Sequence, residues 1–172
     1  MAATTTWYEQ NGTATGSPAH GTESTVTNCD WKSADSATTT RAAAPVAAGE
    51  NSYHKYNYVK FAGTFNEISN VKFAHTAGTL GTGISLKGKI SSTYATPSKS
   101  ALGSSTDITS TTAISSGMSV DLSTTGPNGT SHASSQTTTC YTQYIITQVQ
   151  TTSSAAAGDS GTATLTVQYN EN

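Results

Sequence analysis

Residues 141–149 read Tyr-Thr-Gln-Tyr-Ile-Ile-Thr-Gln-Val, and this stretch decides the fold class. Tyr144, Ile145 and Ile146 place apolar side chains on both faces of an extended segment, which is typical of a central β-strand. Shorter runs on either side of this stretch show period-two alternation. Their apolar positions are Tyr56 and Tyr58, then Val59 and Phe61; Ile68, Val71 and Phe73; Ile84, Leu86 and Ile90; Met118, Val120 and Leu122; and Ala163, Leu165, Val167 and Tyr169.

Turn-forming residues separate these runs, among them Ala77-Gly78, Gly117 and the Gly-Pro-Asn-Gly stretch at 126–129. No window places apolar residues at helical spacing over three turns. Short strands divided by Gly and Pro turns predict a sandwich or jelly roll. We therefore predict an all-β protein, with a single β-sandwich or jelly-roll-like domain at residues 51–172.

Residues 1–50 lack a sustained pattern. Trp7, Tyr8, Val26 and Trp31 are isolated apolar points among Ala, Thr, Ser and Gly. We predict an N-terminal extended arm and linker here, with one or two short strands around Trp7 and Val26. Because every strong alternating run comes later in the chain, we expect the sandwich to fold without this arm.

The composition favours a protein that works through its surface. Thr and Ser supply 34 and 24 of the 172 residues, and only 10% of the chain is charged, against about 25% in ordinary domains. Thr suits pleated strands and Ser suits turns. The net charge of −2, with eight scattered Lys and Arg residues, argues against nucleic-acid binding. We predict a non-enzymatic protein.

The chain has no run of 18 apolar residues and no recognisable signal peptide, so we expect no membrane partner and synthesis in a cytoplasm. Cys29 and Cys140 are the two cysteines. A disulfide between them is an alternative, but a reducing compartment favours two free, buried thiols.

Gly158-Asp159-Ser160-Gly161 matches the residues around a serine-protease nucleophile. A triad would need a base and an orienting carboxylate, and His75 and Asp107 occur in the chymotrypsin-like order. Neither has the sequence context of such enzymes, so we interpret the motif as a hairpin turn. The glycines of 78–83 precede a strand rather than a helix, which indicates a hairpin loop and not a phosphate-binding loop.

Metal-binding patterns are also missing from the sequence. The histidines are far apart, where a zinc site normally clusters its ligands, and the aspartates do not form a calcium-binding loop. We expect surface histidines, and no catalytic, cofactor-binding or metal-binding residues. The residues considered are His20, His54, His75 and His132, and Asp107, Asp121 and Asp159.

Trp7, Tyr8 and Trp31 are the candidate site residues, as a partner interface. They lie in a segment too sparse to bury them in a core of its own. Either they pack back onto the sandwich, or they anchor the arm on another subunit or protein, as interface aromatics often do. With so few charges, binding through them should depend only weakly on salt.

Several stretches carry a family resemblance. They are 68–73 (Ile-Ser-Asn-Val-Lys-Phe), 81–88 (Gly-Thr-Gly-Ile-Ser-Leu-Lys-Gly), 94–97 (Tyr-Ala-Thr-Pro), 144–149, 155–158 and 167–171 (Val-Gln-Tyr-Asn-Glu). Residues 53–172 resemble small β-sandwich structural proteins of tailed bacteriophages, of the capsid decoration (cement) or related virion type. Such families imply no catalytic residues.

The resemblance implies a decoration protein that binds the outer surface of the major capsid lattice, or another virion protein, and stabilises it. We expect a homo-oligomer, with a trimer favoured, located in the virion after synthesis in the host cytoplasm. Many weak contacts repeated by symmetry would provide avidity. Two alternatives stay open: a tail or neck protein of the virion, and a carbohydrate-binding or adhesin module.

Overall fold

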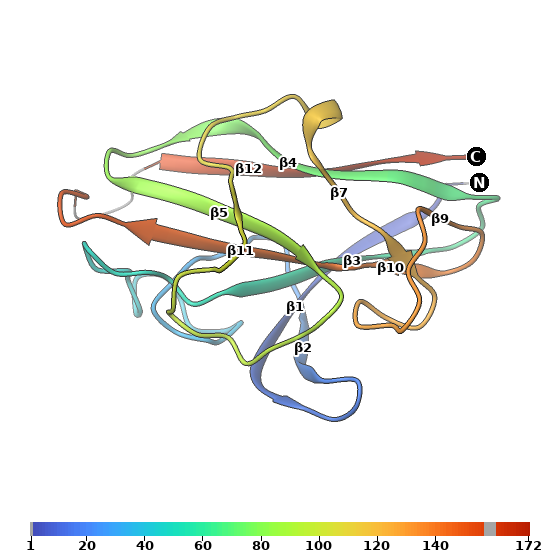
Figure 1. Ribbon diagram of the computed structural model, residues 1–172, viewed down its shortest axis with the longest axis horizontal. Helices are drawn as coiled ribbons and strands as arrows, with labels where there is room; N and C mark the ends of the chain where they lie inside the picture. Colours follow the sequence, from blue (N-terminus) through green and yellow to red (C-terminus); the bar gives the residue numbers. More distant parts are fainter. Residues whose placement is uncertain (1, 157–160) are drawn as a thin grey trace.

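The computed structural model describes residues 2–156 and 161–172, and almost all regular structure in these residues is β-strand (Figure 1). The predicted all-β sandwich is confirmed, since two antiparallel sheets pack together. The larger sheet has the order β2-β1-β3-β11-β5-β6, with β10 pairing both β3 and β8. Its bounds are β1 Thr4–Thr15, β2 His20–Thr25, β3 Lys55–Ala62, β5 Ile84–Ser91, β6 Thr106–Asp107, β8 Leu122–Ser123, β10 Cys140–Thr142 and β11 Tyr144–Thr151.

The smaller sheet has the order β12-β4-β7, with β9 also pairing β4. Its strands are β4 Ile68–Leu80, β7 Met118–Ser119, β9 Ser135–Gln136 and β12 Gly161–Glu171, and a 3-10 turn, η1, spans Ile114–Ser116. Figure 1 shows β4 and β12 side by side, above β11 and β3 of the larger sheet. In the described residues, no helix has the length and apolar character needed to cross a membrane.

Strand β11 is central, as its sequence indicates. It pairs with β5 over the whole of Tyr144–Thr151 and with β3 on its other side. Ile145 faces the inner core between the sheets, whereas Tyr144 and Ile146 face the opposite side of the larger sheet. All three residues are at most 3% exposed, so both faces of the strand are covered.

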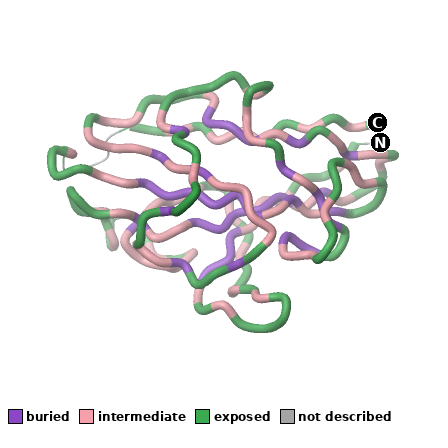
Figure 2. The backbone as a smooth tube through the Cα atoms, viewed as in Figure 1, coloured by how far each residue is buried: buried purple, intermediate pink, exposed green. Residues whose placement is uncertain are grey.

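The inner core fills the space between the two sheets. Its residues come from both sheets and from the connections that cross between them, and Figure 2 shows these buried stretches running through the middle of the molecule. They are Val59, Phe61, Ile68, Val71, Phe73, Leu86, Ile108, Val120, Leu122, Cys140, Ile145 and Val149. The side chains of Val59 and Phe61 therefore point into this core.

A second cluster, the tyrosine cluster, covers the outer face of the larger sheet. Its rings meet edge to face or tilted, with centroids about 5–6 Å apart; such pairs stabilise a fold beyond the area they bury. The segment between β5 and β6 supplies two of its members. The buried members are Tyr56, Tyr58, Tyr94, Leu102, Tyr144 and Ile146.

Residues 1–50 are built into the sheet rather than extended from it, which differs from the predicted arm. Strand β1 pairs with β3 over Thr4–Gln10 and carries β2 on its other edge. Glu9, Gln10 and Asn11 are buried. The sequence shows no apolar alternation in β1, because polar residues such as Glu9 and Asn11 occupy its inward-facing positions.

The segment that follows β2 is fastened to the rest of the molecule by backbone hydrogen bonds. Ser52 N donates to Val149 O at 2.9 Å, and Gly49 N donates to Thr152 O at 3.1 Å. The two ends of the described chain also meet, since Ala3 N donates to a Glu171 carboxylate oxygen at 2.8 Å. The expected linker is therefore a cover over one end of the larger sheet.

This arrangement predicts that residues 51–172 alone do not fold, contrary to the expectation from the sequence. Deleting residues 1–50 removes Glu9, the ion-pair partner of the fully buried Lys55. The deletion also removes β1, which pairs with β3 over Thr4–Gln10, and the side chains of Trp7 and Trp31, which pack against the inner core. Burying one large apolar side chain contributes about 1.5–3 kcal/mol, so these losses together take a large share of the roughly 5–15 kcal/mol that stabilises a domain. In urea titrations followed by circular dichroism, the truncated chain should lack the cooperative transition of the full chain. A transition with the full chain's midpoint would contradict this prediction.

Candidate functional site

The three predicted interface aromatics pack on their own chain. Trp7 and Trp31 lie against the inner core, and Trp31 Nε1 donates to Thr147 Oγ1 at 3.0 Å. Tyr8 lies on the opposite face of the sheet, stacked on Tyr58 with a centroid distance of 5.1 Å. Each is partly buried. Because they lie on two faces of one sheet, the structure does not bring them together into a single patch.

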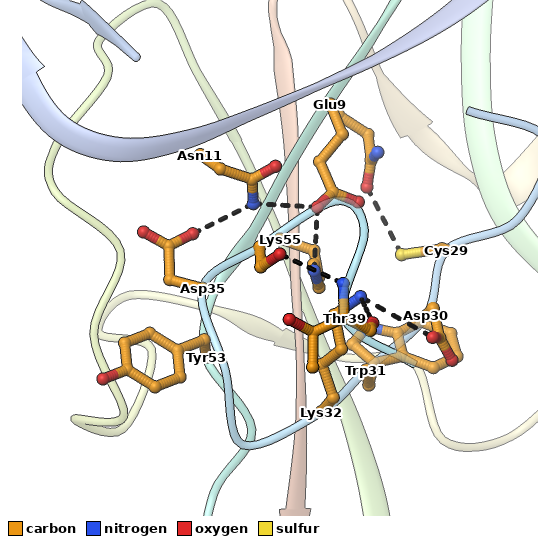
Figure 3. A network of polar contacts seen from close by, with 12 residues as sticks. Glu9, Asn11, Cys29, Asp30, Trp31, Lys32, Asp35, Thr39, Tyr53 and Lys55 are labelled. Carbon is orange, nitrogen blue, oxygen red and sulfur yellow. Dashed lines mark hydrogen bonds and ion pairs between the residues drawn. The ribbon is translucent and has the colours of Figure 1, made fainter. Parts of the chain in front are cut away.

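The polar residues of β1 and β3 form a buried cluster at one end of the inner face, which we call the Glu9 cluster (Figure 3). Lys55 Nζ lies 2.8 Å from Glu9 Oε1, and the two side chains are 0% and 3% exposed. Asn11 Nδ2 donates to the same Glu9 oxygen at 2.8 Å and to Asp35 Oδ1 at 2.9 Å. Gly12 N donates to Asp35 Oδ2 at 2.7 Å. The cluster is a connected network beneath the segment that follows β2.

A second buried lysine anchors that covering segment. Lys32 is 1% exposed, and its Nζ donates to Thr39 O at 2.5 Å. Asp30 lies 3.7 Å from Lys32 Nζ and equally far from the Arg41 guanidinium. The loop is therefore held around a buried cation as well as by its backbone bonds.

Sequence reasoning missed these buried lysines, because the lysines looked scattered and solvent-exposed. A signal for Lys55 exists in the strand pattern. Lys55 and Asn57 have the same parity as Val59 and Phe61, so period-two geometry places all four on the inner face. No comparable pattern surrounds Lys32, which lies in irregular backbone.

Both cysteines are free thiols in the structure, as the sequence favoured; Cys140 is buried, whereas Cys29 is only partly buried. Cys29 Sγ lies 3.3 Å from Asn57 Oδ1 and 3.5 Å from Thr147 Oγ1, whereas Cys140 is fully buried in the inner core. Burial disfavours the thiolate. It raises the pKa of Cys29 to about 12 and that of Cys140 to about 11.

These pKa values predict two unreactive thiols in the folded chain. For Cys29 the rise from 9.0 to about 12 lowers the thiolate fraction about a thousandfold at neutral pH. Titration with a chromogenic disulfide reagent at pH 8 should therefore detect almost no thiol in the native protein. Both should react after denaturation. Rapid modification of either thiol in the native state would contradict the assignment.

The expectation of surface histidines is wrong for His75. This residue is 1% exposed, and its ring nitrogens each lie 2.9 Å from a carbonyl oxygen, of Ile108 and of Ala77. It serves as a bridge between β4 and the segment after β6. His54 is partly buried, and burial lowers its pKa.

The remaining motifs have mixed outcomes. Residues 158–160, which include Asp159 and most of the protease-like motif interpreted as a hairpin turn, lie outside the described residues. Among the residues described, no three His, Cys, Asp or Glu side chains gather as a metal site would require. The hairpin loop predicted at 78–83 is not formed. Gly78 lies within β4, and residues 81–83 form a turn between β4 and β5, which belong to different sheets and do not pair, so this stretch connects the two sheets.

A shallow groove of about 520 Å³ opens between the tip of the β1–β2 hairpin and the loop at 125–128. The ring of Tyr141 lies partly exposed in this groove, with Lys60 Nζ 5.6 Å from the ring centroid. Asn128 Nδ2 donates to Ala19 O at 2.8 Å and joins the two walls. The lining residues are Gln10, Ser17, Pro18, His20, Gly21, Glu23, Tyr58, Thr125, Gly126, Pro127, Asn128 and Tyr141.

Comparison with known proteins adds no relative. No protein-family model matches the chain, and neither the curated proteins nor the solved structures contain a match. The functional argument therefore rests on the residues and on their arrangement.

Proposed function

We propose that this chain is a non-enzymatic structural protein of a tailed-phage virion, a decoration protein that binds the outer surface of the major capsid lattice as a homo-oligomer. The observation that carries the proposal is the edge of the smaller sheet. Strand β12 lies at the end of that sheet and pairs with β4 along one side. An unpaired strand edge is a template for strand addition by another chain.

The composition of β12 supports this role. Residues 161–170 contain no charged residue and no proline, and these are the usual devices that protect an edge strand from pairing. Ala163, Leu165, Val167 and Tyr169 pack toward the inner core. Thr162, Thr164 and Gln168 are exposed. The strand thus offers a long polar but uncharged edge for a contact between copies.

The candidate interface of Trp7, Tyr8 and Trp31 has a smaller part in this proposal. These aromatics already contact their own chain, so a partner would reach only their exposed portions. Edge pairing uses main-chain hydrogen bonds instead, and symmetry multiplies such weak contacts into avidity.

Lysines on the β12 edge should weaken self-association. In Thr164→Lys with Gln168→Lys, each copy presents two charges where a neighbouring strand would pair, so we expect at least a tenfold weaker association, or about 1.4 kcal/mol. Sedimentation velocity over a concentration series measures it. Thr25→Lys, an exposed position on the edge strand β2 of the other sheet, is the matched control. A wild-type chain that stays monomeric, or a double variant that associates normally, would contradict edge pairing.

The location is tested on whole particles. Antibodies raised against the purified chain should label virion heads at regular positions in electron micrographs of particles from the source of this sequence. Labelling confined to tails would favour a tail or neck protein. Particles without label would overturn the virion proposal.

A second candidate, glycan binding, is favoured by the groove. An aromatic ring beside amide and carboxylate groups is the kind of surface that holds a sugar, with an apolar face for the ring and polar groups for orientation. Tyr141 supplies the exposed ring, and Gln10, His20, Glu23 and Asn128 supply polar groups.

If the groove binds glycans, Tyr141→Ala should weaken retention on a glycan array by at least tenfold, about 1.4 kcal/mol. Tyr141→Phe keeps the ring and should bind nearly as the wild type does. Absence of binding by the wild-type chain to any arrayed glycan would remove this candidate and leave the β12 proposal untouched.

A further inference from the structure

Two side-chain nitrogens share one buried carboxylate oxygen in the Glu9 cluster. Lys55 Nζ and Asn11 Nδ2 each lie 2.8 Å from Glu9 Oε1, and Figure 3 shows both contacts on that oxygen. Lys55, Glu9 and Asn11 are 0%, 2% and 7% exposed. An amine, an amide and a carboxyl group that can carry protons between them are thus held together and away from water.

The amide of Asn11 is the unsatisfied member of this cluster. Its nitrogen donates to both Glu9 and Asp35. Its oxygen Oδ1 is buried and accepts no hydrogen bond within the described residues. A buried carbonyl oxygen without a donor costs free energy.

We propose that Lys55 and Asn11 join in an isopeptide bond after folding, with Glu9 as the proton carrier. Glu9 first takes a proton from the Lys55 ammonium, which leaves a neutral amine and a carboxylic acid. The amine nitrogen attacks Cγ of Asn11 and forms the new C–N bond. Glu9 passes its proton to Nδ2 and takes one from the attacking nitrogen. The Cγ–Nδ2 bond breaks, ammonia leaves, and Glu9 ends as the carboxylic acid until the ammonia removes that proton as ammonium.

The surroundings favour each part of this step. Moving one proton from Lys55 to Glu9 replaces a buried ion pair by two neutral groups, with no change in net charge, and so avoids the cost of keeping charges from water. Asn11 Nδ2 already donates to Glu9 Oε1, so the Glu9 acid lies within hydrogen-bond reach of the nitrogen that must gain a proton before ammonia leaves. The strands hold the reacting groups in place, which replaces a bimolecular encounter by an intramolecular one.

A competing reaction would also release ammonia. Gly12 follows Asn11, and its N–H donates to Asp35 Oδ2 at 2.7 Å. Attack of the Gly12 nitrogen on Cγ of Asn11 would form a succinimide without Lys55. The two products have the same mass and differ in their connectivity, so the experiment must identify the linked residues.

Mass spectrometry of the full-length wild-type chain tests the proposal. We expect an intact mass lower by one ammonia than the sequence requires. Tryptic digestion should yield a branched peptide that joins Lys55 to Asn11, with no cleavage after Lys55. A chain of full mass would overturn the proposal. Loss of ammonia with a linear Lys55 peptide would identify the succinimide and overturn it as well.

Variants then assign the roles. Lys55→Arg keeps a positive charge but has no nucleophilic amine, so it should retain the ammonia, whereas Lys87→Arg, at the exposed ion pair with Asp107, should lose it as the wild type does. Glu9→Gln should retain it too, and Glu171→Gln serves as its control. Near-ultraviolet circular dichroism checks that each variant folds.

Glu9→Asp provides a second measurement if the Gln variant does not fold. The aspartate keeps a carboxyl group, but its side chain is one methylene shorter, so the carboxyl group lies farther from Lys55 and Asn11. Formation of the isopeptide bond after refolding should therefore be slower. Wild-type bond formation in either Glu9 variant would overturn the role of Glu9 as proton carrier.

Discussion

The structure depends on one constraint: the central strands of the larger sheet are apolar on both faces, so each face needs its own cover. The smaller sheet covers the inner face of β3 and β11, and the segment between β5 and β6 covers much of the outer face. A chain with 34% hydrophobic residues thereby divides its apolar side chains between two thin layers. Neither layer would suffice alone, because buried apolar area is the main favourable term in folding.

The inner face is not apolar throughout, and its polar end explains why residues 1–50 are required. Where Val59 and Phe61 give way to Asn57 and Lys55 along β3, the inner face is lined by polar partners: Glu9, from the neighbouring strand β1, pairs with Lys55, and Cys29, from the segment after β2, contacts Asn57. Buried charge replaces buried hydrocarbon there. A buried charge needs an opposite charge or hydrogen-bonding groups beside it. The Lys55 end of β3 therefore requires particular neighbouring side chains, such as Glu9, whereas the apolar end accepts any well-packed hydrocarbon.

The sequence predicted the fold class and a strand at each long strand described from residue 55 onward, because period-two alternation is a local signal. The turn predicted at Ala77-Gly78 is wrong, since β4 continues through it to Leu80 and pairs with β12 there. The sequence predicted short strands around Trp7 and Val26, where β1 and β2 lie, but not that β1 is built into the larger sheet beside β3. Glu9 and Asn11 occupy inward positions, and their burial depends on Lys55 and Asp35, which are distant in sequence. The same reason hid Lys32 and His75, whose partners are backbone carbonyl oxygens. Pairing between remote polar groups leaves no periodicity to detect.

The surface is sparsely charged because only 10% of the chain is charged, and hydroxyl groups occupy much of it. Several threonines and serines bond to their own neighbours, as Thr76 does with Thr166 at 2.6 Å, and short side chains lose little conformational freedom when a contact forms. A surface of this kind suits contacts that are repeated and individually weak.

The meeting of the two chain ends has a practical consequence for protein engineering. Ala3 and Glu171 are joined by a hydrogen bond, and Figure 1 places the N- and C-terminal ends next to each other. A tag or cargo domain fused before Ala3 or after Glu171 therefore leaves from one pole of the molecule. A short peptide bridge between these residues would allow circular permutation, with new ends in the exposed turn at Gly16–Pro18.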